Sequence, residues 1–165
     1  MIDIASYTLE DLLLTAIKSE VESNNLYTHL AKNIQNGLLQ DKLAFLAAEE
    51  EKHKLYIEDV YKAHFPDQKI TLPDKTPVPL PEVQIPDEEV PLSKILGMAM
   101  EAEKAANEFY ISLSERFEQD SKIHNMLVYF SDMELGHYKL LEVEKESMQR
   151  FEQADVYWEI VHVGP

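Results

Sequence analysis

Four glutamates and two histidines interrupt apolar stripes that otherwise repeat at helical spacing along the chain. They are Glu20, Glu50, His53, Glu103, Glu134 and His137. A residue inside such a stripe faces the same side as its apolar neighbours, so we expect these six side chains on buried helix faces. In each Glu-x-x-His motif the histidine points the same way as the glutamate, because residues three apart are neighbours on a helix. The pattern predicts a cluster of carboxylates and imidazoles inside the protein.

The two halves of the chain repeat this pattern. Glu20, Asn24 and Tyr27 recur 83 residues later as Glu103, Asn107 and Tyr110, and Glu50 and His53 recur 84 residues later as Glu134 and His137. Each half supplies three candidate ligands, which is a more specific signal than one isolated Glu-x-x-His. A third match, Glu159-x-x-His162, lies in a segment with strand-like patterning and has no repeat partner, so we interpret it as chance.

Buried carboxylates need compensating charge. One unpaired carboxylate is costly to bury, and four would also repel one another. Two divalent cations would cancel four carboxylates, with each histidine as a terminal ligand, Glu50 and Glu134 as bridges, and Glu20 and Glu103 as terminal carboxylates. One glutamate from each of two helices and Glu-x-x-His from each of the other two is the ligand pattern of di-iron and di-manganese bundles. Oxygen and imidazole ligands without thiolate predict two iron ions, with manganese or another divalent metal as the alternative.

Neighbouring polar residues have two interpretations. Tyr27 and Tyr110 are either ordinary core residues or donors to ligand carboxylates on neighbouring helices. Asn24 and Asn107 are weaker candidates for the same role. The remaining histidines, His29, His64 and His124, are interpreted as surface, packing or end-of-bundle residues.

Four long amphipathic segments must position these residues. The first is capped by Thr8 and ended by Gly37, and the others cover about 38–64, 92–117 and 121–148. Prolines concentrated between them make the stretch of about 66–91 an extended connection. They are Pro73, Pro77, Pro79, Pro81, Pro86 and Pro91.

This organisation predicts an all-α, ferritin-like four-helix bundle over residues 1–148. Two antiparallel helical hairpins would be joined by the long Pro-rich crossover, which could also hand the second hairpin to a neighbouring chain. A tail, 149–165, follows. Its Val156–Val161 segment is either strand-like or packs on the bundle.

Composition excludes several function classes. The chain has 165 residues, no cysteine and a net charge of −16. The lack of cysteine rules out disulfides, iron–sulfur clusters and thiolate zinc sites, and the negative charge argues against nucleic acid and anionic membranes as partners. The N-terminal residues have no basic region and the first apolar run is short, so we expect a cytoplasmic protein.

The ligand pattern resembles that of the ferritin-like superfamily, and specifically the rubrerythrin-type domain, over about residues 8–148. The resemblance implies a non-haem di-iron centre that reacts with hydrogen peroxide or dioxygen. Two departures stand out. Without cysteine there is no rubredoxin module, so electrons must come from an external donor. The extra glutamate that rubrerythrins carry one turn beyond the third-helix ligand is absent, since Ala106 and Asn107 occupy the candidate positions.

Three functions are compatible with these residues. The first is a rubrerythrin-type oxidoreductase that reduces peroxide or dioxygen. The second is an iron-binding ferroxidase that feeds iron sequestration in a hollow assembly. The third is a metal-bound protein with a structural or sensing role and no turnover. A homodimer or larger homo-oligomer is expected in each case.

Overall fold

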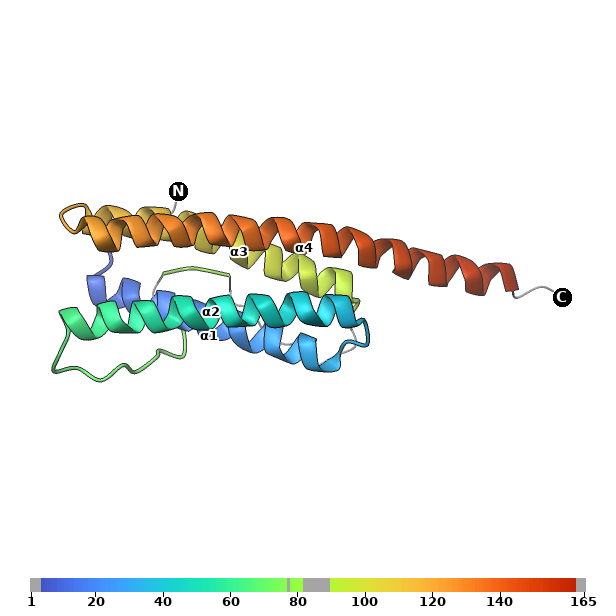
Figure 1. The fold of residues 1–165 in the computed structure, drawn as a ribbon, viewed down its shortest axis with the longest axis horizontal. Helices are drawn as coiled ribbons and strands as arrows, with labels where there is room; N and C mark the ends of the chain where they lie inside the picture. Colours follow the sequence, from blue (N-terminus) through green and yellow to red (C-terminus); the bar gives the residue numbers. More distant parts are fainter. Residues whose placement is uncertain (1–3, 77, 82–89, 163–165) are drawn as a thin grey trace.

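Four long helices form two antiparallel hairpins in the computed structural model (Figure 1). The structure describes residues 4–76, 78–81 and 90–162, with backbone alone for 155–162. The helices are α1 (Leu9–Asn33), α2 (Gly37–His64), α3 (Leu92–Ser114) and α4 (Ser121–His162), with a short 3-10 helix, η1 (Glu115–Phe117), after α3. The main packing is α1 on α2 and α3 on α4. This confirms the predicted all-α bundle of two hairpins.

The predicted start of α1 is present as a capping box. The Thr8 hydroxyl accepts a hydrogen bond from Asp11 N at 3.1 Å, and the Asp11 carboxylate accepts one from Thr8 N at 3.2 Å. Gly37, however, does not end this helix. Asn36 caps α2 by accepting a hydrogen bond from Leu39 N at 3.1 Å, so Gly37 is the first residue of the next helix.

The connection between the hairpins contains no helix in its described residues, 65–76, 78–81 and 90–91. Pro77 and residues 82–89 of the predicted crossover lie outside the described residues. Figure 1 shows α2 ending at one end of the bundle and α3 beginning at the other. Val78 is fully buried and packs into the core beside Phe109.

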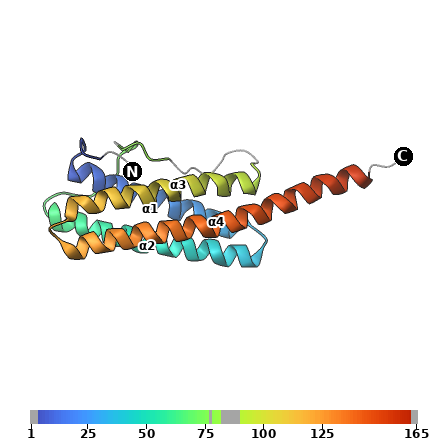
Figure 2. The same ribbon diagram turned by 90° about the horizontal axis from the view of Figure 1, so that it is seen from above.

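The fourth helix is longer than predicted. It continues through His162, so both its expected end near residue 148 and the strand-like interpretation of the tail are wrong. No glycine or proline lies between Gly136 and Gly164, so nothing in the sequence stops a helix that has already formed. Figures 1 and 2 show the last turns of α4 extending past the other three helices.

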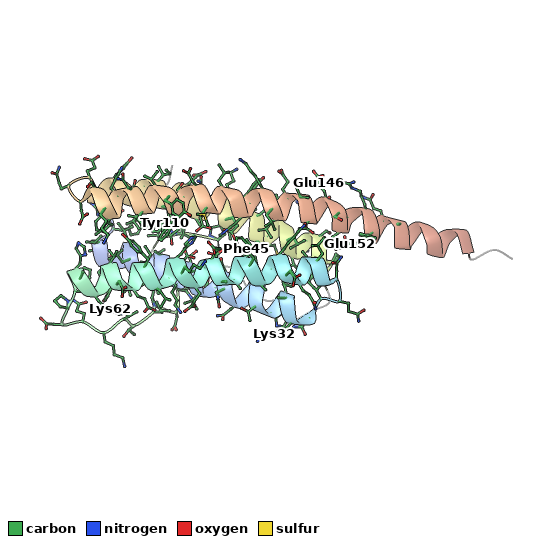
Figure 3. All side chains as sticks on the ribbon, in the orientation of Figure 1. Lys32, Phe45, Lys62, Tyr110, Glu146 and Glu152 are labelled. Carbon is green, nitrogen blue, oxygen red and sulfur yellow. The ribbon has the colours of Figure 1, made fainter. Side chains whose placement is uncertain are left out.

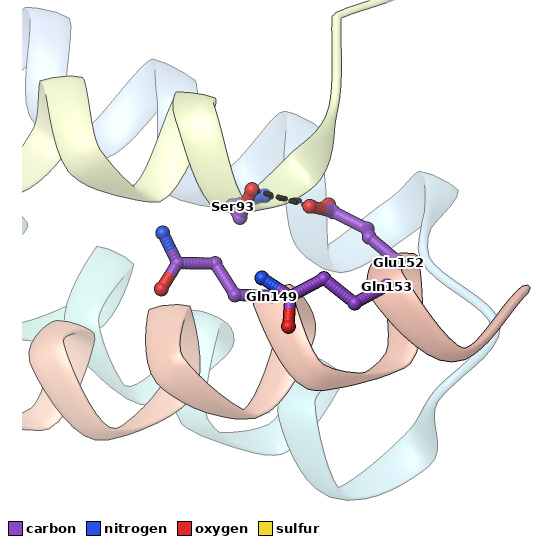
Figure 4. Close-up of a pocket in the computed structure, with 4 residues that line it drawn as sticks. All are labelled: Ser93, Gln149, Glu152 and Gln153. Carbon is purple, nitrogen blue, oxygen red and sulfur yellow. Dashed lines mark hydrogen bonds between the residues drawn. The ribbon is translucent and has the colours of Figure 1, made fainter. Parts of the chain in front are cut away.

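One contact holds α4 where it leaves the bundle. The Glu152 carboxylate accepts hydrogen bonds from the backbone N of Ser93, at 3.0 Å, and from the Ser93 hydroxyl, at 2.5 Å (Figure 4). Ser93 lies in the first turn of α3, where a negative charge interacts favourably with unpaired N–H groups. Gln149 and Gln153 line the same hollow.

Two apolar clusters fill the bundle. One contains Leu12, Leu13 and Ile57 with Phe109 and Phe130, and the other is mostly leucine and alanine. Along α1, the first cluster precedes Glu20 and the second follows it. A polar layer therefore divides the core. None of the described helices is both long enough and apolar enough to cross a membrane.

Candidate metal centre

The polar layer consists of the six residues that the sequence singled out. Each of the four helices places one glutamate there, and α2 and α4 each add a histidine one turn further on. None of the six side chains is in a residue more than 3% exposed. They are Glu20, Glu50, His53, Glu103, Glu134 and His137. The structure brings all six together, while their binding of metal stays a prediction.

The six residues divide into two overlapping groups. Glu20, Glu50, His53 and Glu134 form one, and Glu50, Glu103, Glu134 and His137 form the other. Within each group, the candidate ligand atoms lie within 4.8 Å of one another. Glu50 and Glu134 belong to both groups. Two adjacent positions that share two carboxylates suit a binuclear metal site.

Both histidines direct the same ring nitrogen toward the carboxylates. His53 Nδ1 lies 2.9 Å from Glu134 Oε1 and 3.6 Å from Glu20 Oε2. His137 Nδ1 lies 3.1 Å from Glu134 Oε2 and 3.8 Å from Glu103 Oε2. Glu134 therefore approaches both imidazoles, as a carboxylate shared by two metal ions would.

The donor atoms pass a simple test of fit to metal. Several buried atoms of this cluster make no hydrogen bond of suitable geometry with any described residue: Glu20 Oε2, Glu50 Oε1, His53 Nδ1, Glu134 Oε1 and His137 Nε2. Although His53 Nδ1 is close to Glu134, the contact lacks hydrogen-bond alignment. Buried polar atoms are normally paired. Carboxylate oxygens and imidazole nitrogens that converge without such pairing can be satisfied by cations.

The pKa values show how the site balances its charge without metal. Burial raises the pKa of Glu20 and of Glu103, and repulsion by Glu50 and Glu134 raises both further. Burial alone would lower the pKa of His53, but the surrounding carboxylates raise it to about 12. His137 also has a raised pKa, because its carboxylate neighbours outweigh burial. Protons on the two imidazoles thus compensate part of the carboxylate charge.

Glu134 shows the opposite shift. Burial alone would raise its pKa, but hydrogen bonding to His137 and His53 holds the pKa below its usual range. A carboxylate that stays ionised between two imidazoles is well suited to contact two cations. This agrees with the bridging role predicted for it.

Two tyrosines hold the outer carboxylates across the bundle. Tyr27 on α1 donates a hydrogen bond to Glu103 on α3, and Tyr110 on α3 donates one to Glu20 on α1. Both rings are buried, and Tyr110 lies inside the bundle in Figure 3. Burial, and then the neighbouring carboxylates, raise the pKa of both phenols well above 10.0, so they remain donors. The crossed pair fixes one carboxylate on each side of the site.

The asparagines do not share this role. Asn24 donates to the backbone carbonyl of Ala47 at 2.7 Å, and Asn107 donates to the carbonyl and the hydroxyl of Ser131, at 2.8 Å and 2.7 Å. The expectation that they contact ligand carboxylates was wrong. They join the helices of each hairpin one turn before Glu50 and Glu134.

An aromatic neighbour of the site was not predicted. The ring centroid of Phe130 lies 4.2 Å from that of His53, with the rings tilted by 34°. The internal repeat aligns Phe130 with Leu46, 84 residues earlier, so a comparison of the two halves marks this position as the place where they differ. His29, His64 and His124 belong to neither ligand group.

Comparisons with known proteins agree with this geometry. The family model described as Rubrerythrin matches residues 11–145. A solved structure of a hypothetical protein from Pyrococcus furiosus is 32% identical, with a TM-score of 0.80, over 90% of this chain and 95% of that chain. No curated protein matches. The family match covers all six candidate ligands and both tyrosines, and the chain belongs to the rubrerythrin family.

Proposed function

We propose that the chain is a non-haem di-iron oxidoreductase that reduces hydrogen peroxide or dioxygen with electrons from an external donor. The observation that carries this proposal is the pair of buried ligand groups that share Glu50 and Glu134. Membership in the rubrerythrin family supports it. When bound, two adjacent iron ions would supply two electrons to a small oxidant at one place.

Each residue of the centre has a distinct task. Glu20 with His53, and Glu103 with His137, would each hold one ion, and Glu50 and Glu134 would join the two. Tyr110 and Tyr27 hold the outer carboxylates in position through their hydroxyls. Because the pKa of each phenol is raised, both tyrosines orient the ligands as hydrogen-bond donors and do not act as bases at neutral pH.

The electrons must reach the site from another molecule. The chain contains no cysteine, so it has no thiolate-bound iron centre that could deliver them. The apolar layers on both sides of the site keep bulk water away from the ligand cluster. Small oxidants and protons are therefore the species that the centre has to admit.

The test is an anaerobic ferrous titration of the metal-free protein, followed by mixing with peroxide or with dioxygen. We expect two irons per chain, and oxidation of both in a single exposure. Glu134→Gln should reduce the binding, whereas Glu101→Gln, an exposed change on α3, should not. Zero or one iron in the unaltered chain would overturn the proposal. Continued uptake of many irons with mineral formation would instead favour iron sequestration.

A further inference from the structure

The fourth helix carries a second stripe of residues, on the face opposite its ligands. The inner stripe contains Leu127, Glu134 and Leu141. The outer stripe alternates spacings of four and three residues, the pattern of a coiled coil. Its members are Tyr129, Met133, Gly136, Leu140, Val143, Ser147, Arg150 and Ala154. Seven of these eight residues carry no charge in a chain whose net charge is −16.

This outer stripe lies at the surface of the single chain. Val143 is 63% exposed and Tyr129 is 55% exposed, while Met133 and Leu140 are half-buried. Isolated exposed apolar residues are common and need no explanation. A regular heptad pattern sustained over more than three heptads is different, because it fits the face of another helix.

The stripe also continues into the part of α4 that leaves the bundle. Figures 1 and 2 show this end beyond the other helices. In the sequence, the same spacing reaches Tyr157 and Val161, whose side chains lie outside the described residues. The 42 residues of α4 span about 63 Å. A partner that covers the whole stripe must therefore be a helix of similar length.

A second copy of α4 meets this requirement in one antiparallel register. Leu140 then faces the partner's Val143, Gly136 faces the partner's Ser147, and Tyr129 faces the partner's Ala154. In this register Ser121 lies opposite the partner's His162, so the two helices coincide from end to end. Small residues meet small ones, and the large tyrosine meets alanine. A two-fold axis repeats each of these pairs.

The charged residues beside the stripe agree with the same register. Lys139 and Glu146 are both exposed on the outer flank of α4, and the register places each beside the other's counterpart on the partner. Figure 3 shows Glu146 on the side of α4 away from α2. On the inner flank, Lys42 of α2 pairs with Glu144 of α4, and Phe45 of α2 is 52% exposed nearby. The inner flank is thus neutralised within the chain.

We propose that two copies of the chain associate through the outer face of α4 as an antiparallel, two-fold-symmetric coiled coil. Each projecting helix end then packs along the bundle of the other copy. The partner helix also covers the outer side of the turn that carries Glu134 and His137 on its inner side. The proposal does not depend on metal or on turnover, so it can fail or hold independently of the proposed function.

The first test compares two matched surface changes by sedimentation equilibrium of the full chain. Val143→Glu places a charge at the centre of the stripe, and Leu55→Glu places one at a 49% exposed position on α2. We expect a dimer for the unaltered chain and for Leu55→Glu, and at least about tenfold weaker association for Val143→Glu. A monomeric unaltered chain, or an unaffected Val143→Glu variant, would overturn the proposal. Circular dichroism checks that each variant keeps its helix content.

The second test uses the absence of cysteine to read the register. A Cβ added at Gly136 meets no atom of the chain within 4 Å, so Gly136→Cys combined with Ser147→Cys should fold normally. These positions lie about 16 Å apart along one helix, too far for a bond within the chain. Mild oxidation or a short bismaleimide should link the double variant into covalent dimers. Equally efficient linkage of Gly136→Cys alone would contradict the antiparallel register.

Discussion

The two sides of the metal centre have the same ligands but different surroundings. Glu20 and His53 on one side match Glu103 and His137 on the other through the internal repeat. Yet His53 packs against Phe130 at 4.2 Å between ring centroids, and Tyr110 lies 6.5 Å away. Among the described residues, His53 is the one ring in contact with His137.

The apolar clusters show the same difference. The cluster on the His53 side contains Tyr61, Phe109, Phe117 and Phe130, whereas Tyr27 is the one fully buried aromatic in the cluster on the other side. Charge compensation requires each half to keep its ligands. Packing requires only that each half fill its own space, so the two halves can differ there. We therefore expect two metal positions with unequal affinity.

The largest effect should come from a ligand that both sides share. Glu134→Ala removes a carboxylate common to both groups and leaves two imidazoles without their closest partner, so we expect loss of both metals. His53→Ala and His137→Ala each remove a ligand from one group, so each should retain one metal per chain. Anaerobic ferrous titration measures all three values.

The contrast between the shared and the separate ligands is the decisive part. Two metals bound with unchanged affinity in Glu134→Ala would refute the bridging role. Loss of both metals in only one of the two histidine variants would show that one position must fill before the other. That result would also identify the weaker side.

Acid should weaken metal binding on both sides. In the metal-free protein the pKa of His53 is about 12 and that of His137 is also raised, so both imidazoles hold a proton at neutral pH. A metal needs the unprotonated nitrogen, so binding releases protons and the affinity falls as pH falls, by about tenfold per pH unit for each proton released. The raised pKa values of Glu20 and Glu103 act in the same direction.

Titration calorimetry in buffers of different ionisation enthalpy counts the released protons. His53→Ala and His137→Ala should each release about one proton fewer than the unaltered chain. An affinity independent of pH between 6 and 8 would show that the imidazoles are already neutral before metal binds. Comparison of the two variants shows whether both sides hold their proton equally.

The sequence was sufficient to predict the ligand cluster because burial and charge leave few alternatives. A glutamate inside an apolar stripe must find a partner, and the repeat supplies the same residues twice, so helical periodicity alone brings the six together. Periodicity identifies a face but not a partner. Asn24 and Asn107 were placed on the correct side of their helices, but the backbone carbonyl of the adjacent helix is closer than any carboxylate.

The errors at helix ends have a similar physical origin. Gly37 can end one helix or begin another, and the Asn36 side chain, which caps α2, decides between them. The Val156–Val161 segment has side chains that favour strands, but a helix already formed upstream adds residues at little cost. Local preference was therefore a poor guide next to an uninterrupted 42-residue helix.

The tyrosines offer a smaller, side-specific effect. Tyr110→Phe removes the donor to Glu20, and Tyr27→Phe removes the donor to Glu103. Loss of a hydrogen bond to a ligand carboxylate typically weakens metal binding by about 10- to 100-fold. We expect each variant to weaken one of the two binding steps and to leave the other near its original affinity. Equal weakening of both steps in either variant would mean that the two metals do not bind independently.

The smallest expected effect tests the aromatic difference itself. Phe130→Leu introduces the side chain type that the repeat places at position 46, and it removes the ring beside His53. We expect the free energy of unfolding to fall by about 1 kcal/mol and the affinities of the two metal positions to become more alike. Chemical denaturation and ferrous titration measure the two effects.

Phe117→Leu is the matched control for this change. Phe117 and Phe130 are each 5% exposed and belong to the same apolar cluster, but Phe117 packs against His64 and not against a candidate ligand. The control should lose similar stability and leave both metal affinities unchanged. If both variants shifted the metal affinities equally, the effect would come from general loosening of the core. If neither did, the aromatic surroundings of His53 would serve packing alone, and the two sides would be equivalent toward metal.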